Sequence, residues 1–195
     1  MQTQKVKLQD IAKITTGLPV QRYIGKEDAK KQKIIHTMPE LEINEEFHTS
    51  EEDISEAIKD RFYSKEHDIL YKVQQNSFAK EITTETDAII PNSYIIIRVI
   101  DTSKVNTTFL TYYLNDPRVE YEIQRTIDST KIMKVSTKIL KDLQVLLPSK
   151  EEQDKQVELI TKINKRIELK KKSIQCDEKL INSLYDTVIG DAYAN

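Results

Sequence analysis

The sequence predicts an α+β protein: a globular domain of mixed helices and strands, followed by one long C-terminal coiled-coil helix. Over residues 1–148, short β-branched runs alternate with amphipathic segments, which is typical of mixed secondary structure. From residue 149 to Gly190, no proline or glycine interrupts the chain. An isoleucine or valine recurs there every seven residues, the spacing of a coiled-coil seam. We therefore expect two domains, residues 1–148 and 149–195.

The N-terminal third combines a short amphipathic segment with two stretches of opposite charge. Lys7–Ile14 places apolar side chains on one helical face and is followed by Gly17, so a short helix is expected. Residues 20–33 carry five lysine or arginine residues against two acids, whereas residues 40–56 carry eight acids and no lysine or arginine. Ser50 can cap a helix. We therefore predict a helix from there through Phe62, with its acidic face in solvent.

The middle of the chain shows strand signals and then two helix signals. The β-branched runs that predict strands are 69–73, 88–90, 94–100 and, later, 132–135. Pro91-Asn92 separates two of these runs and predicts a turn. The predicted short helices are 107–114 and 117–127. Asp116 can cap the second helix, and Pro117 suits its first position.

The junction between the two domains has a local cause. The apolar run 143–147 predicts a strand, which Pro148 ends because proline has no backbone donor for the ladder. Ser149 and Glu152 then form a capping-box pattern that starts a helix. Gly190 is the next natural stop. At 1.5 Å per residue this helix is a rod of about 60 Å.

Composition narrows the classes of function. The net charge is −2, so any nucleic-acid role must depend on local patches rather than on bulk charge. One cysteine and no long apolar run predict a cytoplasmic protein with no membrane span. The three histidines lack metal-ligand spacing, and three glycines in the whole chain leave no phosphate-binding loop. We expect no metal, no cofactor, no catalytic residues and no enzymatic activity.

Several motifs together resemble the specificity subunit of Type I restriction-modification enzymes. They are the opening KLQDIAKITTG, the segment HDILY at 67–71, the run NTTFLTYYLNDPRVEYEIQ at 106–124, and the stretch STKIMKVSTKILKDLQVLLP followed by SKEEQDKQV. The chain departs from the family in two loops: His67 replaces the usual glycine, and residues 128–130 replace a glycine-serine turn. It also has one recognition domain and one long helix where the family usually has two of each. It is therefore similar to half of such a subunit.

The resemblance implies a protein that performs no chemistry. It would read double-stranded DNA through a target recognition domain and hold methyltransferase subunits, with restriction subunits in the full complex. The S-adenosylmethionine cofactor would then belong to the partner. The alternative is a non-enzymatic coiled-coil adaptor whose globular domain binds protein rather than DNA. A nuclease, which would cleave DNA alone with a metal, is a third and weaker hypothesis.

Candidate DNA-binding residues follow from their side-chain type and their loop positions. Amides and arginine can each make two hydrogen bonds to a base edge, while lysine and small polar groups suit phosphates. The amides after the 69–73 strand are the first choice for base contacts. The alternative is that these are ordinary polar turns. The acidic 40–56 segment should face away from DNA. The candidates are Arg22, Tyr23, Lys26, Gln74, Gln75, Asn76, Ser77, Ser129, Thr130, Lys131 and Lys134.

The long helix is predicted to pair antiparallel with a second copy of the chain. A parallel pair would set Lys170 against Lys170 and Asp177 against Asp177, whereas an antiparallel pair centred near Lys172 brings opposite charges together. Two identical domains would read an interrupted palindrome. Pairing with a different half-subunit stays open. The predicted dimer interface consists of Ile160, Ile163, Ile167, Lys170, Ile174, Asp177, Ile181, Leu184 and Val188.

Overall fold

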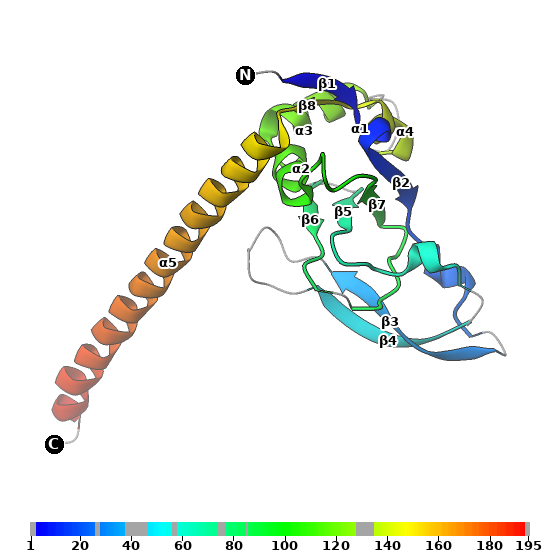
Figure 1. Ribbon diagram of the computed structural model, residues 1–195. Coiled ribbons are helices and arrows are strands. Elements are labelled where there is room, and N and C mark those ends of the chain that lie inside the picture. Colours follow the sequence, from blue (N-terminus) through cyan, green and yellow to red (C-terminus); the bar gives the residue numbers. More distant parts are fainter. Residues whose placement is uncertain are drawn as a thin grey trace. The chain divides into compact units, whose positions relative to one another are not determined.

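The computed structural model describes residues 3–25, 28–37, 47–55, 58–73, 77–84, 86–127 and 135–193, and for Thr37 and residues 188–193 it describes the backbone only. The chain divides into two units, Met1–Asp154 and Lys155–Asn195. The first unit mixes strands and helices, and a long helix runs from its end through the second (Figure 1). The predicted α+β class with a long C-terminal helix is confirmed.

A four-stranded antiparallel sheet forms the centre of the first unit. Its strand order is β2-β7-β5-β6. The bounds are β2 Ala12–Thr16, β5 Ile69–Lys72, β6 Ala79–Glu81 and β7 Tyr94–Val99. The predicted strands at 69–73 and 94–100 are therefore confirmed, each to within one residue. Residues 88–90 contribute only isolated bridges, through Ile89, and form no strand.

Two antiparallel ribbons accompany the sheet. In one, β1 (Gln4–Lys7) pairs with β8 (Gln144–Leu147), so the N-terminal segment lies against the strand that precedes the long helix. In the other, β3 (Ala29–Thr37) pairs with β4 (His48–Ser55). The predicted 143–147 strand is confirmed. Figure 1 shows the β3–β4 ribbon as a separate layer beside the sheet.

The described residues of the first unit also form four short α-helices and two 3₁₀ turns. Their bounds are α1 Leu8–Ile11, α2 Thr107–Leu114, α3 Pro117–Arg125, α4 Thr137–Asp142, η1 Val20–Arg22 and η2 Asp60–Phe62. The predicted helices at 107–114 and 117–127 are confirmed. Their N-termini are capped by the side chains of Asn106 and Asp116, which accept hydrogen bonds from the backbone N–H groups of Phe109 and Arg118.

The alternation of side chains along β5 and β7 buries both faces of the sheet. On one face, Tyr71 and Ile97 pack in a cluster with Leu110 of α2 and Leu140 of α4. On the other, Leu70 and Ile96 pack with Ile35 of β3 and with residues of the 78–90 segment. A third cluster joins the β3–β4 ribbon to the loop before η1 and to η2 through Leu18, Ile34, Ile54, Phe62 and Ile89. Burial on both faces explains the continuous apolar run of β7.

Two N-terminal helix predictions are wrong. Only Leu8–Ile11 of the predicted Lys7–Ile14 helix is helical, because Ile14 belongs to β2 and pairs with Ile97. The helix predicted from Ser50 through Phe62 is replaced by β4 and η2. The acidic strand β4 lies in register beside the basic strand β3, with Lys31 opposite Asp53 and Lys33 opposite Glu51. Opposite charges on facing strands favour this pairing. The helix prediction considered only neighbouring residues in the sequence and so could not include this contact between strands.

The long helix α5 spans Lys150–Tyr193. Its start agrees with the predicted cap, because the hydroxyl of Ser149 accepts a hydrogen bond from the backbone N–H of Glu152 at 3.4 Å. The predicted stop at Gly190 is wrong, since the helix continues for three more residues. A glycine inside a helix costs only about 1 kcal/mol relative to alanine, so favourable neighbours can extend the helix past it.

Gln153 fastens the first turn of α5 within the first unit. Its side chain is fully buried and its carboxamide makes three hydrogen bonds to backbone groups. The oxygen accepts from the N–H of Asn106 at 2.8 Å, and the nitrogen donates to the carbonyls of Lys104 at 3.0 Å and Pro148 at 2.9 Å. Asp154 adds an outer contact, accepting from the Asn106 side chain at 2.6 Å. The turn after β7 and the root of α5 are thereby joined.

Candidate functional site

The loops that the sequence singled out lead away from one end of the central sheet. Thr16 ends β2 and pairs with Ile95, and Lys72 ends β5 and pairs with Tyr94, the first residue of β7. We call this end, with the described residues 17–25, 73, 77–78, 91–93 and 135, the loop end. Candidate residues from three separate parts of the chain fall in or next to these segments.

Backbone hydrogen bonds connect the segments of the loop end in a row. The turn at 91–93 is the centre. Its Asn92 N–H donates to the carbonyl of Leu18 at 2.8 Å, and its Ser93 carbonyl accepts from the N–H of Val73 at 3.1 Å. The carbonyl of Val73 accepts in turn from the N–H of Val135 at 3.2 Å. Residues 18, 92–93, 73 and 135 therefore lie next to one another although they are far apart in sequence.

Gly17 allows this close approach. A Cβ atom at this position would lie 2.2 Å from the carbonyl oxygen of Pro91 and 2.5 Å from that of Ile90. Both atoms belong to the backbone, so they cannot rotate aside as a flexible side chain could. The glycine predicted to end an N-terminal helix instead lets the end of β2 pack against the 91–93 turn.

The amide candidates Gln74, Gln75 and Asn76 lie outside the described residues, in the connection between β5 and β6. Ser77 is described and partly buried. It hydrogen-bonds Tyr71, whose burial raises the pKa of the phenol to about 12. Ser77 thus has an interior partner, and its role toward DNA stays a prediction.

The other candidates divide between described and undescribed residues. Arg22 is exposed at the end of η1. Tyr23 is half-buried against the cluster beneath the β3–β4 ribbon, and its carbonyl accepts from the N–H of Ser55 at 3.1 Å. The candidates that lie outside the described residues are Lys26, Ser129, Thr130, Lys131 and Lys134. Most of the predicted strand at 132–135 lies outside them as well.

The turn at 91–93 is the part of this site that sequence reasoning missed. The dipeptide Pro91-Asn92 was interpreted only as a separator of two strands. Its position between Leu18 and Val73 depends on how β2 and β5 flank β7, which is a long-range property. The sequence signal that could have identified this turn is Asn92, a polar residue between the apolar runs 88–90 and 94–100.

The segment HDIL carries a structural ion pair at the opposite end of β5. Asp68 is buried and accepts from Arg98 at 2.6 and 2.8 Å, while Arg98 also donates to the carbonyl of Tyr63. His67 has a backbone φ of 66°, in the left-handed region. Glycine is favoured there, which agrees with the glycine usual at this position in the family the sequence resembles. The loop keeps that geometry with a histidine.

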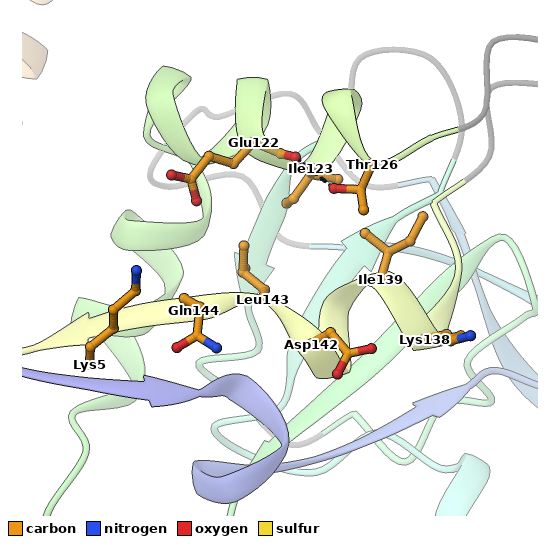
Figure 2. A pocket seen from close by; sticks show the side chains of 9 residues that line it. All are labelled: Lys5, Glu122, Ile123, Thr126, Lys138, Ile139, Asp142, Leu143 and Gln144. Carbon is orange, nitrogen blue, oxygen red and sulfur yellow. Dashed lines mark hydrogen bonds between the residues drawn. The ribbon is translucent and has the colours of Figure 1, made fainter.

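A surface pocket of about 440 Å³ lies between the last turn of α3, the helix α4 and the β1–β8 ribbon (Figure 2). Lys5, Lys138, Glu122 and Asp142 contribute two positive and two negative side chains to it. Asp142 is also paired with Lys7 at 2.9 Å. This balanced lining provides no concentrated charge for a phosphate or a metal. Among the described residues, no cluster of three or more histidine, cysteine or acidic side chains could hold a metal ion.

Family comparison assigns the chain to a class of protein. Residues 2–176 match the model of the Type I restriction modification DNA specificity domain, so this chain belongs to that family. This match confirms the resemblance that the motifs indicated. No curated protein matches the chain. Within the described part of the chain, no helix has the length and apolar character of a membrane span.

Solved structures share the fold at low identity. The HsdS subunit from Thermoanaerobacter tengcongensis is 11% identical, with a TM-score of 0.63 over 85% of this chain and 43% of its own. The Type-I restriction-modification system S subunit from M. genitalium is 14% identical, with a TM-score of 0.54 over 86% and 40%. A chain from a study of complex assembly and conformational transition of the type I R-M system is 16% identical, with a TM-score of 0.68 over 98% and 45%. This chain spans less than half the length of each.

Proposed function

We propose that this chain is a DNA-reading half-subunit of a Type I restriction-modification complex and that the loop end contacts one half-site. The observation that carries this proposal is that Leu18, Val73 and Val135, which lie near the candidate residues in sequence, meet around the 91–93 turn. DNA readers combine base contacts with phosphate contacts, and such a combination needs several loops at one surface. Membership of the specificity-domain family supports the same function.

In this proposal the chain performs no catalysis. Methyl transfer with S-adenosylmethionine, and DNA cleavage where restriction subunits are present, belong to partner subunits. The contribution of this chain is to choose the DNA sequence and to hold those partners on it. The basic outer face of α5, with Lys162, Lys165 and Arg166, is the proposed docking region for methyltransferase subunits. The expected location is the cytoplasm.

The proposed partner along α5 is a second copy of the chain. The seam predicted from the sequence is solvent-accessible along its described length, with Ile163, Ile167, Ile174, Ile181 and Leu184 each about half exposed. Ile160 is partly exposed, Lys170 and Asp177 are exposed, and the side chain of Val188 lies outside the described residues. Exposed apolar side chains at heptad spacing favour burial against another helix.

Charge along the helix supports an antiparallel pair. Residues 162–172 contain six lysine or arginine residues and one acid, whereas residues 173–191 contain four acids and one lysine. An antiparallel pair centred near Lys172 sets the basic stretch against the part of the partner that holds Asp177 and Glu178. A parallel pair would set the basic stretch against itself, which is unfavourable.

Binding to DNA tests the proposed reading function. Replacing Gln74, Gln75 and Asn76 by alanine should abolish preference for the cognate half-site and leave the salt dependence of binding intact, because amides release no counterions. Replacing Lys131 and Lys134 should weaken binding to all sequences and flatten the salt dependence. A wild-type chain without any salt-sensitive affinity for duplex DNA would favour the adaptor hypothesis instead.

Methylation mapping tests the partners and the symmetry. The chain should co-purify with the methyltransferase subunits of its host, and the methylated sites should form an interrupted palindrome, because a two-fold dimer matches a two-fold DNA site. Two unrelated half-sites would instead indicate pairing with a different half-subunit. Failure to bind any methyltransferase subunit would contradict the proposed complex.

Cysteine cross-linking tests the antiparallel arrangement. On a Cys176→Ser background, the double variant Ile160→Cys/Leu184→Cys should form disulfide dimers readily, because the two seam positions face each other in the antiparallel pair. The single variant Ile160→Cys should not, because Ile160 then lies opposite Leu184. Equal cross-linking of both variants would indicate a parallel pair. Sedimentation at micromolar concentration, with and without methyltransferase subunits, is the accompanying measurement.

A further inference from the structure

The turn that carries Asn92 is held by hydrogen bonds on both sides. The N–H of Asn92 is bonded to Leu18, and the carbonyl of Ser93 to Val73, as described above. Tyr94 also donates to the carbonyl of Pro91 at 3.0 Å, which closes the turn itself. Pro91 has a fixed φ, and the missing Cβ of Gly17 lets the β2 end press against this turn. The backbone of Asn92 is therefore a rigid support.

The side chain of Asn92 differs from those of the other asparagines described in the first unit. Asn115 pairs with both backbone groups of Ala79 at the edge of the sheet, at 2.7 and 2.8 Å. Asn106 caps α2 and contacts Asp154. Asn92 is exposed, and its carboxamide has no hydrogen-bond partner among the described residues. Of these three asparagines, Asn106 and Asn115 therefore form hydrogen bonds within the fold, and Asn92 faces solvent.

The surroundings of Asn92 suit a nucleic-acid surface. Lys72 is the register partner of Tyr94, two residues along from Asn92, and its ammonium lies 5.5 Å from the centre of the Phe78 ring. Arg22 is exposed on the segment that follows Leu18. Cations on the segments joined to this turn suit phosphate contacts, which position a protein so that another residue can meet a base.

We propose that Asn92 is a specificity-determining residue that reads one base of the half-site. A carboxamide offers a donor and an acceptor side by side, which matches the N6 amino group and N7 of adenine in the major groove. Asn92 therefore reads adenine, and the rigid turn lowers the entropy lost when this contact forms. This inference rests on the proposed DNA-reading function.

Selection of binding sites from a random duplex library tests the inference. The proteins compared are wild type, Asn92→Ala, Asn92→Asp and a control, Asn182→Ala. The control changes an exposed asparagine of α5. Asn92→Ala should lose about 5- to 150-fold of discrimination at one base pair and none at the others, with its salt dependence unchanged. Asn92→Asp keeps an acceptor and loses the donor, so its preference at that base pair should move from adenine toward cytosine. The control should select the wild-type site.

Three results would overturn the inference. The first is that both Asn92 variants select the wild-type half-site with undiminished discrimination. The second is that both variants bind all sequences equally more weakly than wild type does, which would identify a phosphate contact. If Asn92→Ala fails to fold by circular dichroism, the assigned free carboxamide is wrong, because an exposed unpartnered side chain contributes little to stability. A wild-type chain that binds no DNA would instead refute the proposed function itself.

Discussion

The two turns that flank the central strand β7 use the same chemical group in opposite ways. Before Tyr94, the 91–93 turn presents the carboxamide of Asn92 to solvent. After Val99, the segment 104–106 at the end of the next turn receives the carboxamide of Gln153, which is fully buried and makes three hydrogen bonds. The buried amide is committed to holding the root of α5. The exposed amide is available to a ligand.

This difference indicates where to look for binding function in this fold. A polar side chain whose hydrogen bonds are satisfied inside the protein contributes to stability, and its loss leaves buried groups unpaired. A polar side chain on a rigid, exposed turn contributes little to stability and can be conserved or exchanged according to the ligand. Stability and specificity should therefore separate cleanly between the two turns.

The largest expected effect is at the buried turn. Gln153→Met keeps a similar volume but leaves the N–H of Asn106 and the carbonyls of Lys104 and Pro148 without partners. Each unsatisfied buried group costs about 1–3 kcal/mol, so a loss of about 3 kcal/mol in the free energy of unfolding is expected, since the costs are not fully additive. Urea unfolding measures it. Gln175→Met, the same change at an exposed position of α5, should stay within about 0.5 kcal/mol of wild type. Equal midpoints for the two variants would contradict the role of Gln153.

The second effect concerns the support of the exposed turn. Gly17→Ala places a methyl group 2.2 Å from the Pro91 carbonyl oxygen, so the turn must move. Overpacking of this kind costs about 1–3 kcal/mol. Gly25→Ala is the matched control, because that glycine has open space around its Cβ position and a φ of +68°, so only the backbone cost of about 1 kcal/mol applies. Gly17→Ala should also reduce discrimination at the base pair assigned to Asn92, and unchanged discrimination would mean that the turn need not be rigid.

The sequence predicted the parts of this fold whose causes are local. The cap at Asp116, the strand ended by Pro148 and the helix begun at Ser149 all depend on residues within a few positions of one another. The acidic segment at 40–56 shows the limit. Its serine and acids favour a helix locally, yet strand β4 forms because β3 supplies lysines in register. No local pattern contains that partner.

The candidate site was predictable in its pieces and not in its assembly. The segments around Arg22, Ser77 and Val135 could be selected by residue type. Their meeting at the loop end depends on β2 and β5 both flanking β7, which places Leu18 and Val73 on either side of Asn92. The same holds for Gln153, which belongs to a recognisable motif although two of its three hydrogen bonds reach back almost fifty residues.

A third prediction separates the two tasks of Asn106. Its side-chain oxygen caps α2 by accepting from Phe109 N–H at 3.0 Å, and its nitrogen donates to Asp154. Asn106→Ala removes both interactions and should cost about 1 kcal/mol, the usual value of a lost N-cap. Asn106→Ser restores the cap alone and should recover most of the loss in urea unfolding. Failure of serine to recover any stability would assign the effect to the contact with α5.

The smallest expected effect is the pH dependence of the outer contact at the root of α5. The pKa of Asp154 is lowered, first by its hydrogen bond with Lys150 and then by that with Asn106. A carboxyl group whose pKa is lower in the folded state stabilises the fold above its ordinary pKa of about 3.9, and this contribution is lost as the pH falls through the lowered value. Wild type should therefore have a higher Tm than Asp154→Asn at pH 7, and the two should converge as the pH falls through the lowered pKa of Asp154. Because the group is solvent-exposed, salt should also reduce the difference at pH 7. A difference that is independent of both pH and salt would contradict a role for the charge of Asp154 at the root of α5.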